Sequence, residues 1–86
     1  MKRNKTPKKR IWPEIAGWLG AGAIIAAYAL VSFGLMQSDS IAYQLLNLLG
    51  AAGIIIISAV KHVRQTVLLN VFWAVIALSA LVLMLV

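Results

Sequence analysis

The side chains that could carry chemistry in this sequence are few, and they do not form a catalytic group. The chain has two acidic residues, one histidine and no cysteine. Glu14 and Asp39 flank an apolar segment, and a helix between them would hold the two carboxylates roughly 30 Å or more apart. His62 lies in a polar stretch, away from every membrane-embedded serine. Acid–base catalysis needs groups within hydrogen-bond reach, so we expect no enzyme activity, no metal site and no cofactor.

The remaining candidates are polar side chains inside apolar segments. They are Tyr28, Ser32, Tyr43, Gln44, Asn47 and Ser58, followed later in the chain by Asn70 and Trp73. Two interpretations stay open. These groups can join helices by hydrogen bonds, worth about 0.6 kcal/mol on average and at most about 2 kcal/mol. They can also line a polar cavity for a small solute, and the candidate ligand-binding residues are then Tyr43, Asn47, Asn70 and Trp73.

Three apolar segments must position these groups. The chain has 86 residues, 63% of them hydrophobic, and a mean hydropathy of +0.96. A soluble domain of this size could not bury so much apolar surface, so lipid is the expected solvent. The segments at 15–36, 41–60 and 66–86 are each long enough to cross a bilayer. We predict an all-α integral membrane bundle of three transmembrane helices, with a basic arm at 1–12 and one membrane domain at 13–86.

The depths of the two asparagines in such a bundle differ. Asn47 lies about 9 Å in from the membrane face at which the second segment starts, and Asn70 about 6 Å in from the opposite face. The two are therefore not expected to bond directly. Each needs another acceptor, on the first helix or on another subunit.

The basic residues predict the orientation of the chain. Six of the eight lie in the first ten positions, and the other two separate the second and third segments. Two spans lie between these clusters, so every basic residue falls on one face of the membrane. The positive-inside rule then places the N-terminus in the cytoplasm and the C-terminus outside a bacterial inner membrane. We expect these side chains to contact lipid headgroups rather than nucleic acid: Lys2, Arg3, Lys5, Lys8, Lys9, Arg10, Lys61 and Arg64.

Small residues recur at spacings of three and four along the first segment, beginning at Ala16. Such a stripe lets another helix backbone approach closely. It is also the candidate interface between copies of the chain. The predicted helix-packing residues are Gly20, Ala23, Ala27, Gly34, Gly50 and Gly53. Ala27-Tyr28-Ala29 also fits the cleavage pattern of a secretory signal, but the apolar run continues beyond it, so we expect no cleavage.

The pattern Ser40-x-x-Tyr43-x-Leu45-Leu46-Asn47-x-x-Gly50, with Asn70-x-x-Trp73 after it, resembles a family of small bacterial three-span membrane domains. That family is functionally uncharacterised and loosely labelled permease or transporter. A more distant similarity is to the three-helix half-transporters of sugars, the SemiSWEET and PQ-loop type. Those work as dimers and use an asparagine of the third span, which corresponds to Asn70. Here the first span has no Pro-Gln pair, and the expected orientation is the opposite one.

Two functions are consistent with these features. The first is a homo-oligomeric small-solute transporter of permease type, working as a homodimer or larger assembly because three helices alone cannot enclose a pathway. The alternative is a non-catalytic structural or regulatory subunit that packs against a larger membrane complex. A small basic pore former is a third reading, but the chain ends in Leu-Val-Leu-Met-Leu-Val rather than in a charged tail. The solute itself stays unknown.

Overall fold

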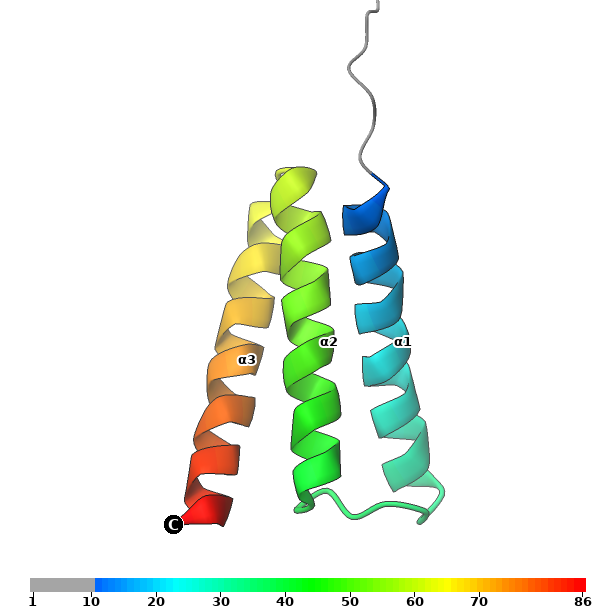
Figure 1. The fold of residues 1–86 in the computed structure, drawn as a ribbon, viewed down its shortest axis with the longest axis vertical. Helices are drawn as coiled ribbons and strands as arrows, with labels where there is room; N and C mark the ends of the chain where they lie inside the picture. Colours follow the sequence, from blue (N-terminus) through cyan, green and yellow to red (C-terminus); the bar gives the residue numbers. More distant parts are fainter. Residues whose placement is uncertain (1–10) are drawn as a thin grey trace, which may run out of the picture.

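The computed structural model describes residues 11–86 and consists there of three α-helices (Figure 1). They are α1 (Trp12–Ser32), α2 (Ile41–Val60) and α3 (Arg64–Leu85). All three are long and apolar enough to cross a membrane. The predicted all-α membrane fold is confirmed. The headgroup contacts predicted for Lys2, Arg3, Lys5, Lys8, Lys9 and Arg10 lie outside the described residues.

The three helices lie side by side in a single layer, with α2 in the middle (Figure 1). Both α1 and α3 pack on α2, whereas no Cα atoms of α1 and α3 come within 8 Å of each other. Residues 11–86 of one chain therefore enclose no interior between all three helices. Most large apolar side chains of the described residues are exposed, as expected for helices that face lipid.

The helix α1 begins and ends earlier than the predicted span of 15–36. Pro13 stands in its first turn, where the fixed φ of proline suits a helix start. At its other end the N–H of Leu35 donates to Leu30 O at 2.8 Å, and that of Gly34 donates to Val31 O at 3.1 Å. This is a Schellman motif, and Gly34 takes its left-handed position with φ +74°.

The helix α2 has the predicted bounds of 41–60. Ser40 is its N-cap, and the Ser40 hydroxyl accepts from the N–H of Tyr43 at 3.2 Å. A second Schellman motif ends it, in which the N–H of Val63 donates to Ser58 O at 2.9 Å. His62 occupies the left-handed position with φ +59°. This tight turn lets α3 begin at Arg64, before the predicted start at 66.

The start of α1 lies at the same end of the layer as the turn between α2 and α3 (Figure 1). An ion pair joins the two places, with Lys61 Nζ 3.0 Å from Glu14 Oε2. The loop between α1 and α2, which contains Asp39, lies at the opposite end of the layer (Figure 1). Lys61 and Arg64 are thus at the same end of the layer as the start of α1. Which side of the membrane that end faces stays a prediction.

Candidate functional site

Small residues bring the backbones of α1 and α2 into direct contact. A Cβ atom added at Gly20 would lie 2.6 Å from Gly50 O, and one added at Gly53 would collide with Ala16 O. Gly20, Gly50 and Gly53 are accordingly buried. No side chain could be inserted here without moving a backbone, so this interface has no room for a ligand.

The predicted packing residues do not all belong to this interface. Ala27 is buried and Ala23 half-buried on α1, as the stripe predicts. The prediction for Gly34 is wrong, because it lies beyond the helix and nothing comes within 4 Å of its Cβ position. Gly17 was not predicted, although it is buried against Ile57, and its spacing of three from Gly20 was the available signal. The stripe of α1 is used within the chain, so it is not free to join two copies.

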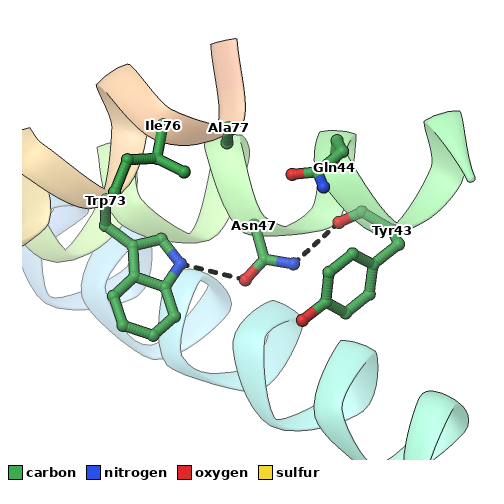
Figure 2. Close-up of a pocket in the computed structure, with 6 residues that line it drawn as sticks. All are labelled: Tyr43, Gln44, Asn47, Trp73, Ile76 and Ala77. Atoms are coloured by element: carbon green, nitrogen blue, oxygen red, sulfur yellow. Dashed lines mark hydrogen bonds between the residues drawn. The ribbon is translucent and has the colours of Figure 1, made fainter. Parts of the chain in front are cut away.

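Asn47 connects α2 to α3. Its Nδ2 donates to Tyr43 O at 2.8 Å, and its Oδ1 accepts from Trp73 Nε1 at 3.0 Å (Figure 2). The expectation of a partner on the first helix or on another subunit was wrong. The amide of Asn70 donates instead to Thr66 O, whereas Trp73 lies about 4.5 Å further along α3 and its indole reaches the Asn47 amide.

Asn70 is also buried, but it lies apart from this group. Its Nδ2 donates to Thr66 O at 3.0 Å, one turn back on α3, and this is its hydrogen bond within residues 11–86. It does not line the pocket that contains Tyr43, Asn47 and Trp73. The structure therefore separates Asn70 from the other three candidate ligand-binding residues.

This pocket has a volume of about 250 Å³ and lies between α2 and α3. Three of the four candidate residues, Tyr43, Asn47 and Trp73, contribute to it, and so does Gln44, another of the embedded polar groups. Two further lining residues were not predicted: Ile76 and Ala77 (Figure 2). The signal for Ile76 and Ala77 is their spacing of three and four from Trp73, which puts all three on one helix face.

The polar groups of the pocket differ in how many hydrogen bonds they make within the described chain. Both ends of the Asn47 amide are bonded inside the chain. The Gln44 amide reaches back to Ser38 O at 3.5 Å, a long contact. Among the described residues nothing is hydrogen-bonded to the Tyr43 hydroxyl, so it and Gln44 are the groups best able to bind a solute. The Trp73 indole supplies an apolar wall.

The pocket is lined by uncharged side chains. No Asp, Glu, His, Lys or Arg of the described residues lines it. Within residues 11–86 no group of three or more His, Cys, Asp or Glu side chains could hold a metal ion. Its chemistry is that of hydroxyl, amide and aromatic groups, which recognise uncharged molecules.

The comparisons with known proteins place the chain in a family. No curated protein and no solved structure matches it significantly. A protein-family model matches residues 13–86, which include all of α2 and α3, α1 from Pro13 onward, and every residue of the pocket. The chain therefore belongs to the family that this model defines.

Proposed function

We propose that the protein is a homo-oligomeric transporter of small uncharged solutes, of permease type, in a bacterial inner membrane. The observation that supports this is the pocket between α2 and α3. It gathers Tyr43, Gln44 and Asn47 from one helix and Trp73 from another, within segments that are long and apolar enough to cross the bilayer. Polar groups inside a membrane are costly, and they commonly mark solute pathways.

The size and lining of the pocket favour a small neutral solute. Its volume of about 250 Å³ is below the roughly 300–1,000 Å³ of pockets for drug-sized ligands. A charged solute would lose its hydration without gaining an ion pair, because no charged side chain of the described residues lines the pocket. Tyr43 and Gln44 offer hydrogen bonds, and Trp73 offers a flat apolar surface.

A second copy is needed for transport because the chain forms a single layer. The described helices leave the pocket open on one side, with Trp73 43% exposed. Another copy placed over that side would enclose the solute. The small-residue stripe of α1 cannot serve as this interface, since α2 covers it.

The resemblance to membrane domains labelled permease or transporter supports the proposal at particular residues. Ser40 caps α2, Gly50 packs against α1, and Tyr43, Asn47 and Trp73 line the pocket. The shared pattern thus combines one cap, one packing position and the solute site. Asn70, which would correspond to the third-span asparagine of the sugar half-transporters, donates to Thr66 O on its own helix and does not line this pocket.

Uptake by purified protein in liposomes tests the proposal, with a panel of radiolabelled sugars and neutral amino acids as probes. Tyr43→Phe removes only the hydroxyl and Gln44→Leu only the amide, so both should fold and lose uptake. Asn70→Leu is the matched control outside the pocket and should retain uptake in any folded fraction. Crosslinking in the same liposomes should give a dimer or larger species. A monomer in lipid, or uptake unaffected by Tyr43→Phe and Gln44→Leu together, would contradict the proposal.

The proposed orientation can be tested separately, because the chain has no cysteine of its own. Ser38→Cys places one thiol in the loop between α1 and α2. Gln65→Cys places one at the start of α3, at the opposite end of the layer. A membrane-impermeant maleimide added to intact cells should label the first variant and not the second. The reverse pattern would place the N-terminus outside.

A structural or regulatory subunit is the second candidate, and two observations favour it. Both ends of the Asn47 amide are hydrogen-bonded within the chain. The large side chains Trp18 and Tyr28 of α1 are 76% and 72% exposed. A photocrosslinking amino acid at position 28 should then capture another membrane protein in cells. Capture of a defined partner, with no uptake by the purified chain, would favour this function over transport.

A further inference from the structure

A second hollow lies at the turn between α2 and α3, apart from the solute pocket. It has a volume of about 710 Å³ and is lined by Ala59, His62 and Val63, and by Arg64, Val67, Leu68 and Val71 of α3. None of these residues lines the pocket around Asn47. Solute transport through that pocket makes no use of this groove, so a ligand bound here is independent of the proposed transport.

The lining of the groove changes from charged to apolar along α3. Arg64 is the first of its α3 residues, and Val67, Leu68 and Val71 follow at spacings of three and four on the same helix face. Arg64 and Val71 are about 10 Å apart along the helix axis. Leu68 is 60% and Val71 41% exposed, so these apolar side chains are not covered by other described residues. A charged residue followed by an apolar surface matches the headgroup and the acyl chain of a phospholipid.

The positive charge of Arg64 is not balanced by a carboxylate of residues 11–86. The chain has two acidic residues, and Glu14 is paired with Lys61 at 3.0 Å. Asp39 lies in the loop at the other end of the layer (Figure 1). Arg64 therefore has no carboxylate partner within residues 11–86. His62, which the Schellman turn holds beside it, offers ring nitrogens rather than a negative charge.

We propose that this groove binds one anionic phospholipid. Arg64 binds the phosphate, for which its planar guanidinium is well shaped, and His62 donates a further hydrogen bond. One acyl chain lies along Val67, Leu68 and Val71. This differs from the general attraction of basic residues to an acidic membrane surface, because it requires the shape of the groove as well as its charge.

The test measures phospholipid retained by the full chain. The protein is reconstituted in mixed phosphatidylglycerol and phosphatidylcholine, extracted in detergent, and washed in about 1 M salt, where charges more than about 3 Å apart are screened. Bound lipid per mole of protein is then counted by mass spectrometry. Wild type should retain phosphatidylglycerol stoichiometrically and in preference to phosphatidylcholine. Excess inorganic phosphate should not displace it, because the acyl chain contributes to binding.

Two variants attack the site and two serve as matched controls. Arg64→Gln removes the phosphate ligand and Ala59→Trp fills the groove without changing charge. Each should lower retention about tenfold or more, as expected for the loss of a charge-assisted hydrogen bond or of the acyl contact. Lys61→Gln removes the same charge, and Ala42→Trp adds the same bulk at an exposed position at the other end of α2. Both controls should retain the lipid.

Several results would overturn the proposal. Equal losses in Arg64→Gln and Lys61→Gln would show general surface attraction. Retention by Ala59→Trp would show that the groove is not the site, and displacement by inorganic phosphate would show a free-anion site. Circular dichroism of every variant separates these outcomes from misfolding. The basic N-terminal arm is unchanged in all of them, so its contribution cancels.

Discussion

The two sides of α2 associate with their neighbours in different ways. Toward α1 the contact is made by glycines, which have no side chain, so that the backbones at Gly20, Gly50 and Gly53 touch. Toward α3 it is made by polar side chains, with the Asn47–Trp73 hydrogen bond between the helices. In lipid, apolar surfaces gain little by meeting each other, so close packing and hydrogen bonding are the forces that remain. The middle helix uses one on each side.

This difference explains where a ligand can bind. Backbones in direct contact leave no space between α1 and α2 at these glycines. Tyr43 and Trp73 instead line a pocket of about 250 Å³ between α2 and α3. The packed side thus has no space at its glycines, and the polar side contains the pocket in which we propose that a solute binds.

The largest effect is expected from adding one methyl group to the packed side. Gly20→Ala would place a Cβ atom 2.6 Å from Gly50 O, and a backbone atom cannot move aside as a side chain can. We expect a loss of about 3 kcal/mol, the upper part of the usual range for overpacking. Unfolding by SDS, followed by circular dichroism, measures it.

The control for this variant is Gly22→Ala on the same helix. Nothing lies within 4 Å of that Cβ position, so the change should be neutral or stabilising by less than about 1 kcal/mol. Similar stabilities for the two variants would mean that α1 does not pack on α2 through Gly20.

A smaller loss, about 1–2 kcal/mol, is expected from Gly17→Ala. The new Cβ would meet Ile57 Cγ2 at 2.6 Å, which is a side-chain atom. The second change Ile57→Ala removes that atom and should therefore cost less in the Gly17→Ala background than in wild type. A double-mutant cycle in the same unfolding assay measures this coupling, and strict additivity would place Gly17 outside the interface.

The polar contact between α2 and α3 should contribute less to the free energy of unfolding than the glycine contact between α1 and α2. A double-mutant cycle of Asn47→Leu and Trp73→Phe should give a coupling of about 0.6 kcal/mol, and at most about 1.7 kcal/mol, the range of hydrogen bonds between membrane helices. A coupling of several kcal/mol would mean that the polar contact with α3 stabilises the fold as strongly as the glycine contact with α1. No coupling would mean that Trp73 does not bond to Asn47.

The smallest effect is expected at the ion pair between the ends of α1 and α2. The Lys61 and Glu14 side chains are 58% and 45% exposed, so water weakens their attraction. Glu14→Gln should cost at most about 0.5 kcal/mol, and the difference from wild type should vanish at about 1 M salt. A loss that persists at high salt would show that Glu14 acts by packing instead.

Much of the fold follows from local sequence patterns. The three helices follow from apolar runs long enough to cross a bilayer, and the bounds of α2 follow from Ser40 as a cap and the polar turn after Val60. The early end of α1 could also be predicted, because Gly34 is suited to the left-handed position of a Schellman motif. The position of Lys61 and Arg64 at the same end of the layer as the start of α1 follows from counting the helices between them.

The choice of partners was decided only by the tertiary structure. Whether the stripe of α1 meets α2 or another copy, and whether Asn47 bonds to Trp73 or elsewhere, depends on how each helix is rotated about its axis. In a soluble protein the apolar face reveals that rotation. Here lipid and neighbouring helices accept the same apolar side chains, so hydropathy determines that a segment spans the membrane and not which way it faces. That is why the sequence alone determined three spans and several polar candidates, and why the three-dimensional arrangement was needed to separate Asn70 from the pocket.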